Sequence, residues 1–209
     1  MQQMILRKLK ECADQQYQLP KGILGQYFGE KMALQHRTET LWTLNLLNLT
    51  EEERVLEIGC GAGYAIKQLL KRPNVEYVAG LDLSESILRS AKTRNRWAIN
   101  EGRAGFIQGN VCKIPLDNDM FTKIYSIHSI YFWDLTIETI SEIHRVLKNN
   151  GSVTITLCNG KNGESWSGVN HMLETQLLPL MKKAGFKKVK LVKGPDSRQF
   201  QTVAVIGEK

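Results

Sequence analysis

The stretch "VLEIGCGAGYAI", residues 55–66, places three glycines within five positions directly after a short apolar run. Only Glu57 interrupts the run, and a short, nearly continuous apolar segment is typical of a strand covered on both faces in a parallel sheet. Gly59, Gly61 and Gly63 carry no side chains, so backbone N–H groups at the start of the next helix can approach a ligand closely. The stretch therefore predicts a strand, a ligand-binding turn and a helix.

The rest of the chain continues this alternation of strands and helices. Further strands are predicted at residues 75–83, 104–110, 121–130 and 152–158, and helices at 62–72, 84–102, 136–148 and 171–184. Repeated units of this length imply right-handed crossovers and a parallel sheet with helices on both faces. Residues 185–193 and 200–209 are predicted to form a hairpin, which places one antiparallel strand in the sheet.

The chain length and the positions of Pro and Gly predict a single domain over residues 1–209. Residues 1–50 form a helical pattern broken at "LPKGILG", which predicts a helical cap segment before an α/β core at 51–209. The N-terminal dozen residues are too charged, and their apolar part too short, for a signal peptide. We therefore expect a cytoplasmic protein.

Composition and charge narrow the class further. The net charge is +7, and no long uncharged apolar stretch could span a bilayer. The four cysteines are spread singly, which indicates neither a zinc site nor a redox pair, and we expect no metal. The basic residues gather on predicted helix and edge-strand positions, and no extra module is evident, so we do not expect a nucleic-acid partner.

The acid before the glycines decides between two kinds of ligand. The glycines run G-x-G-x-G rather than the G-x-G-x-x-G of dinucleotide sites, and Glu57 would repel a pyrophosphate but can pair with an ammonium group. Asp82, at the end of the second strand, can accept both hydroxyls of a ribose. Asn110 and Val111, at the end of the third strand, can bind an exocyclic amine and a ring nitrogen. An amino acid, a ribose and an adenine in this order describe S-adenosylmethionine.

Four stretches, "VLEIGCGAGY", "VAGLDLS", "GNVCKIPLDNDMFTKIYSIHSIYFW" and "EIHRVLKNNGSVTIT", resemble successive motifs of class I S-adenosylmethionine-dependent methyltransferases. The resemblance is to the small-molecule branch that also holds the ubiquinone and menaquinone methyltransferases. It implies an α/β, Rossmann-like fold with a seven-stranded, mostly parallel sheet, an antiparallel C-terminal strand and helices on both faces. It also implies cofactor-binding roles for Glu57, Gly59, Cys60, Gly61, Gly63, Asp82, Leu83, Asn110, Val111 and His128. Many relatives have Asp where this chain has Asn110, a weaker but still competent acceptor.

Residues for the methyl acceptor are less sharply indicated. His128, at the end of the fourth strand, is either a proton-accepting base or a residue that lines the pocket. Tyr131 lies in "YFW", which serves either packing or an aromatic clamp for the sulfonium. Residues 159–170, with Trp166, suit a mobile lid. In the N-terminal segment, Tyr27, Met32 and His36 either close over the site or pack on the core.

Three functions remain open at this point. The first is an enzyme that methylates a small molecule, the second an RNA or protein methyltransferase, and the third a protein that binds S-adenosylmethionine without transferring its methyl group. Glu57 and the glycine spacing disfavour a nicotinamide dehydrogenase. The sequence indicates neither the acceptor, nor which kind of acceptor atom is methylated, nor the oligomeric state.

Overall fold

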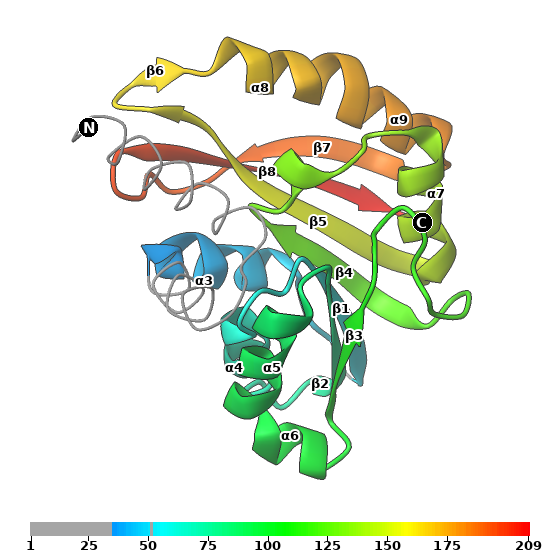
Figure 1. Cartoon of the computed structure of the whole chain (residues 1–209). Coiled ribbons are helices and arrows are strands. Elements are labelled where there is room, and N and C mark those ends of the chain that lie inside the picture. The colour runs from blue at the N-terminus through cyan, green and yellow to red at the C-terminus, as the bar shows by residue number, and fades with distance from the viewer. Residues whose placement is uncertain (1–34, 51) are drawn as a thin grey trace, which may run out of the picture.

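The architecture is an α/β sandwich built on one mixed sheet, seen in the computed structural model, which describes residues 35–50 and 52–209 (Figure 1). The strands are β1 Glu53–Ile58, β2 Val75–Asp82, β3 Ala104–Gln108, β4 Phe121–Ile127, β5 Leu147–Lys161, β6 Glu164–Ser165, β7 Lys187–Lys193 and β8 Phe200–Glu208. Seven strands follow the order β3-β2-β1-β4-β5-β8-β7, and the two-residue β6 pairs with β5 beside this path. Strands β1 to β5 pair in parallel, whereas β8 is antiparallel to both β5 and β7, as the hairpin pattern predicts.

Helices cover both faces of the sheet, which confirms the predicted class. They are α3 Arg37–Leu46, α4 Tyr64–Leu69, α5 Glu85–Arg94, α6 Arg96–Asn100, α7 Ile137–Val146, α8 Ser167–Met172 and α9 Leu178–Lys183, with the π-helical turn η2 Leu173–Leu177 between the last two and a 3₁₀ turn η1 at Ile130–Phe132. Figure 1 shows α3 to α6 on one side of the sheet and α7 to α9 on the other. None of the helices in the described part of the chain is long and apolar enough to cross a membrane.

Strand β1 explains why the sheet has a core on each face. Side chains of a strand alternate between faces. Leu56 and Ile58 belong to the core beneath α7, η2 and α9, whereas Val55 belongs to the core beneath α3 to α6. Glu57 shares a face with Val55 and the fully buried Tyr125 of β4. The glycine turn therefore begins from a strand held by apolar contacts on both sides.

Several predicted element boundaries differ from the observed ones, and two of the differences have a clear physical cause. The helix expected over residues 84–102 is interrupted at Asn95, because this buried side chain donates from Nδ2 to Ala91 O and to Gly63 O at 3.0 Å each. The helix expected to run to residue 148 ends at Val146, and β5 begins at Leu147, which pairs with Phe121 of β4. In both places a tertiary contact overrides a local helical pattern.

The stretch expected to be a mobile lid is largely regular structure. Residues 159–170 form the end of β5, the short strand β6 that pairs back onto it, and the first residues of α8. Pairing of Gly160 with Ser165 closes this hairpin. Trp166 lies beside β5, where its backbone N donates to Asn159 O at 2.8 Å.

Candidate active site

The glycine turn joins β1 to α4, and its three glycines differ in the space around them. All three have positive φ, 74° at Gly59, 49° at Gly61 and 71° at Gly63. A Cβ at Gly59 would lie 2.4 Å from Ser129 Cβ, and one at Gly63 would lie 2.6 Å from Asn95 Nδ2, whereas a Cβ at Gly61 would meet no atom within 4 Å. Gly59 and Gly63 are therefore required by packing as well as by backbone conformation, and Gly61 leaves its surroundings open.

Asp82 ties this turn to the second strand. Its Oδ2 accepts a hydrogen bond from Gly61 N at 2.9 Å, and its Oδ1 accepts one from Ser84 N at 2.9 Å. Burial raises the pKa of Asp82, although these backbone hydrogen bonds act in the opposite direction. Each carboxylate oxygen has a second lone pair, so Asp82 can also accept hydroxyl groups of a ribose.

A groove at the carboxyl edge of the sheet brings together five of the predicted cofactor residues. Its lining is Ile58, Gly59, Leu81, Asp82, Leu83, Gly109, Asn110, Val111, Ser129, Phe132 and Trp133. Leu83 is half exposed, as a residue that packs on an adenosine ring needs to be. Asn110 Oδ1 accepts from Cys112 N at 3.0 Å, which leaves it one further lone pair for an adenine amine.

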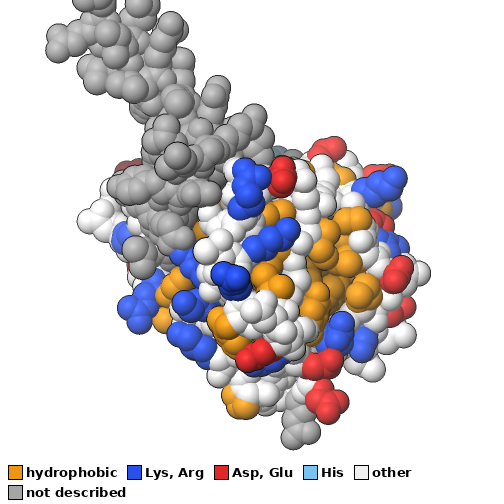
Figure 2. Space-filling model, turned by 60° about the horizontal axis from the view of Figure 1, so that its bottom comes forward, with side chains coloured by type: hydrophobic (Ala, Val, Ile, Leu, Met, Phe, Trp, Pro, Cys, Tyr) orange, Lys and Arg blue, Asp and Glu red, His pale blue; other side chains and the backbone are white. Residues whose placement is uncertain are grey.

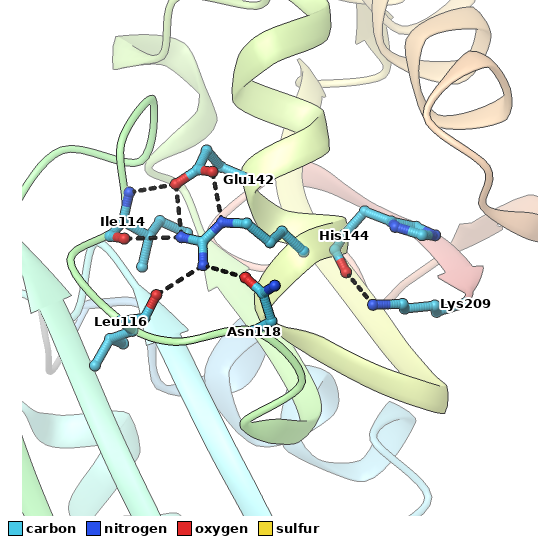
Figure 3. Close-up of polar contacts among 7 residues, drawn as sticks. Ile114, Leu116, Asn118, Glu142, His144 and Lys209 are labelled. Atoms are coloured by element: carbon cyan, nitrogen blue, oxygen red, sulfur yellow. Dashed lines mark hydrogen bonds and ion pairs between the residues drawn. The ribbon is translucent and has the colours of Figure 1, made fainter.

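The loop that carries Asn110 and Val111 is fastened to α7 by Arg145. The guanidinium donates to Glu142, to the carbonyl oxygens of Ile114 and Leu116, and to Asn118 (Figure 3). Glu142 Oε2 in turn accepts from Ile114 N at 2.8 Å. Sequence reasoning missed this network, which holds the Asn110 and Val111 side of the groove in place.

Glu57 and Cys60 lie beneath the turn rather than on the groove wall. Glu57 is 4% exposed, and its Oε2 has no hydrogen-bond partner among the described residues. Burial raises the pKa of Glu57 well above its usual value, and the negative charge of Asp82 adds to this, while Tyr125 opposes it. An ammonium group would supply the donors that this carboxyl lacks, so the residues fit the amino-acid part of S-adenosylmethionine. Burial likewise raises the pKa of the Cys60 thiol.

A second pocket of about 310 Å³ lies next to the groove and shares Phe132 with it. Its lining is His36, His128, Tyr131, Phe132, Cys158, Trp166, Arg198 and Phe200. It therefore joins the predicted His36, His128, Tyr131 and Trp166, while Tyr27 and Met32 lie outside the described residues. Cys158, Arg198 and Phe200 are additions that sequence reasoning missed, because Arg198 is in a hairpin turn and the other two belong to ordinary strand patterns.

His128 stands at the junction of β4 and the second pocket. Its backbone has a φ of 56°, and its Nε2 is buried without a hydrogen-bond partner in the described part of the chain. Burial lowers the pKa of His128 to about 3, with electrostatic interactions with His36 and Arg198 acting in the same direction and Glu39 opposing them. His128 is therefore a neutral imidazole near pH 7, a weaker base than an unperturbed histidine.

Arg198, His36 and Glu39 form a polar cluster at the back of the second pocket. Arg198 Nη2 lies 3.0 Å from His36 Nδ1 and 3.2 Å from Glu39 Oε1. Because a guanidinium only donates, Nδ1 of His36 accepts in this arrangement. Burial by itself would raise the pKa of Glu39, but the hydrogen bonds and charges around it hold that pKa at about 2. Glu39 is therefore an ionised partner for Arg198.

Tyr131 combines packing with pocket lining. Its hydroxyl accepts from Cys158 N and donates to Cys158 O, both at 2.7 Å, so it fastens η1 to β5 while its ring faces the pocket. Burial raises the pKa of Tyr131 and also raises the pKa of Cys158, the latter to about 11. Neither group is ionised near neutral pH.

Strand order, glycine turn and acidic residue at the end of β2 together define the fold of class I S-adenosylmethionine-dependent methyltransferases. Residues 56–155 match the family described as "Methyltransferase domain". The "Uncharacterized methyltransferase YdaC" of Bacillus subtilis (strain 168) is 29% identical over 161 residues, which are 77% of this chain and 86% of that one. Together these matches support a class I S-adenosylmethionine-dependent methyltransferase with S-adenosylmethionine as its cofactor.

Solved structures share the fold. A S-adenosylmethionine-dependent methyltransferase from Aquifex aeolicus superposes with a TM-score of 0.71 at 19% identity, covering 87% of this chain and 97% of that one. Phosphoethanolamine N-methyltransferase 2 of Haemonchus contortus, in complex with S-adenosylmethionine, superposes with a TM-score of 0.66 at 18% identity, covering 82% of this chain and 52% of that one. The likeness extends beyond the motif region to most of this chain.

Proposed function

We propose that this methyltransferase acts on a small molecule held in the second pocket. The observation that carries the proposal is the placement of this pocket beside the cofactor groove, with Phe132 in both walls. A volume of about 310 Å³ lies at the lower end of the range usual for small-molecule sites. Donor and acceptor bound in the two compartments would meet at Phe132.

The chain's residues have distinct roles in this proposal. Gly59, Gly61 and Gly63 admit the methionine part, Glu57 pairs with its ammonium group, and Asp82 accepts the ribose hydroxyls. Leu83, Asn110 and Val111 hold the adenosine. Bound S-adenosylmethionine supplies a methyl carbon activated by a positive sulfur, and the sulfur keeps the electron pair of the bond that breaks. The remaining task of the protein is to align the acceptor and exclude water.

His128 is best described as a residue that lines and orients in this proposal. The lowered pKa keeps its ring neutral, so it does not repel the sulfonium, and its unpartnered Nε2 can hydrogen-bond an acceptor group. Its ring lies 4.3 Å from that of His36, centroid to centroid. The aromatic rings of Tyr131 and Phe132 add a surface that attracts a cationic sulfur.

The N-terminal segment is proposed to complete the acceptor side of one domain spanning residues 1–209. His36, directly before α3, already lies in the pocket wall. Tyr27 and Met32 precede it in the chain and lie outside the described residues, so their place at the site is part of this proposal. Trp166, from residues 159–170, lines the same pocket.

A macromolecular acceptor is the alternative. On the face shown in Figure 2, Lys and Arg side chains are mixed with hydrophobic side chains and with Asp and Glu, so this face has no uninterrupted basic band for a phosphate backbone. The pocket lining also includes four aromatic side chains, Tyr131, Phe132, Trp166 and Phe200, which offer apolar contacts to a small acceptor.

Calorimetry and turnover together test the proposal. We expect S-adenosylmethionine and S-adenosylhomocysteine to bind, and S-adenosylhomocysteine to form when a fraction of metabolites of low molecular mass is added. Formation only with RNA or with protein fractions would select the alternative. Binding without turnover in any fraction would leave a cofactor-binding protein and defeat the proposal.

A further inference from the structure

We infer that the methyl acceptor carries a carboxylate or similar anionic group and that Arg198 selects it. The inference rests on the proposed function and names the substrate class for its pocket. It starts from the pocket lining. Among the described residues that line the pocket, Arg198 is the only permanently charged side chain, and none is Asp or Glu. An apolar wall with one cation is suited to an apolar molecule with one negative group.

Arg198 is held in position before an acceptor arrives. Its Nη2 is fixed by His36 and Glu39, and its guanidinium carbon lies 5.4 Å from the centre of the Phe200 ring. Its Nε and Nη1 have no hydrogen-bond partner in residues 35–50 and 52–209. Because a guanidinium presents its donors in a rigid fork, these atoms can receive an anionic group without rearranging.

A second cation, Lys161, lies close to Arg198 although it does not line the pocket. Lys161 Nζ lies 4.6 Å from the centre of the same Phe200 ring, so two cations flank this ring. The acid that pairs with Arg198, Glu39, is completely buried and does not line the pocket. Arg198 and Lys161 therefore both place positive charge against the Phe200 ring of the pocket wall, which favours an anionic acceptor.

The same cluster has an alternative occupant, a divalent metal ion. Single ligand atoms of His36, Glu39 and His128 all lie within 4.8 Å of one another. The Arg198 guanidinium already lies against His36 and Glu39, and a second cation placed there would be repelled. The arrangement therefore favours an anion bound to Nε and Nη1 of Arg198 over a metal ion bound to His36, Glu39 and His128.

Paired probes can test the inference without knowledge of the natural acceptor. Octanoate, phenylacetate and indole-3-acetate are compared with their uncharged amides for binding to the full-length protein saturated with S-adenosylhomocysteine, by ligand-observed NMR and calorimetry. We expect at least one acid to bind roughly tenfold more tightly than its amide, as for a hydrogen-bonded charge pair. Equal binding of acids and amides, or binding of no acid, would overturn the inference.

Variants assign the preference to one residue. Arg198→Met should abolish the preference for the acid, and Arg198→Lys should keep part of it. The matched control is Arg54→Met, because Arg54 also stacks on an aromatic ring, Tyr77 at 4.8 Å, and pairs with a glutamate, Glu76 at 2.9 Å, but lies near the start of β1 at the opposite edge of the sheet. A preference that survives in Arg198→Met would refute the inference.

One further measurement separates this inference from the proposed function. Affinity for S-adenosylhomocysteine should be unchanged in Arg198→Met, because Arg198 does not line the cofactor groove. If the unaltered protein does not bind S-adenosylhomocysteine, the proposed function itself is wrong. Cofactor binding together with an indifference to acceptor charge would defeat only the inference about Arg198.

Discussion

The cofactor groove and the acceptor pocket are neighbours that share Phe132, yet they are built in different ways. The groove is made by successive strand ends, with glycines, backbone groups and Asp82 at positions that the sheet topology fixes. The acceptor pocket is made by side chains from His36, the end of β4, β5 and the β7–β8 turn. Changes in the groove should therefore disturb the fold and the cofactor, whereas changes in the pocket should alter selectivity.

The largest effect is expected at Gly59. Gly59→Ala forces a positive φ on alanine and brings its Cβ to 2.4 Å from Ser129 Cβ, so we expect a loss of roughly 2 to 4 kcal/mol in the free energy of unfolding, measured in urea. Gly61→Ala is the matched control, since it has the same backbone problem without a clash. It should cost roughly 1 kcal/mol. Equal losses would show that Ser129 yields and that packing is not the reason for Gly59.

Asp82 should produce the next largest effect, on binding. Asp82→Ala removes the proposed ribose acceptor and the bond from Gly61 N, so S-adenosylmethionine should bind more weakly by ~1 to 3 kcal/mol in calorimetry. Asp117→Ala, an exposed acid in the loop before β4, is the control and should change little. Unchanged affinity in Asp82→Ala would remove Asp82 from the cofactor site.

This contrast explains how far the sequence could be interpreted. The positions of the glycine turn, Asp82 and Asn110 at strand ends could be predicted, because strand ends and positive-φ positions leave a local signature, while their roles in cofactor binding stay predictions. Arg198 could not be predicted, because its place in the pocket depends on how the β7–β8 turn folds back toward α3. The early end of the helix at Asn95 was missed for the same reason, since its cause is a contact with Gly63.

The pH dependence of stability probes the acceptor side. Unfolded, His128 takes up a proton near pH 6.5, but the folded protein keeps its pKa at about 3. Between these values the unfolded chain holds one more proton, so stability should fall as pH falls, by at most about 1.4 kcal/mol per pH unit. Glu39, with its pKa at about 2, adds a loss in the same direction below about pH 4.5.

From pH 6.5 to 5 the lowered pKa of His144 and the raised pKa of Glu57 also contribute, so the contribution of His128 is the difference between the unaltered protein and a His128 variant. His128→Asn should flatten the stability curve there, and asparagine is chosen because it tolerates the positive φ of this position. Urea unfolding at several pH values measures the slope. Parallel curves for the unaltered protein and the variant would contradict a buried, neutral His128. If His128 is a base, the variant should also slow turnover far more than it weakens cofactor binding.

Arg145 offers the smallest but most selective change, because it acts on the groove without touching it. Arg145→Met removes the hydrogen bonds to the carbonyl oxygens of Ile114 and Leu116 (Figure 3), so the loop that carries Asn110 and Val111 loses its attachment to α7. The network is partly exposed to water, so we expect a loss of only about 1 kcal/mol in stability. A larger proportional loss should appear in affinity for adenosine-containing ligands than for methionine alone, measured by calorimetry. Equal weakening of binding for both kinds of ligand would mean that Arg145 stabilises the sheet as a whole. The loop that carries Asn110 and Val111 would then not be what distinguishes the groove from the adjoining pocket.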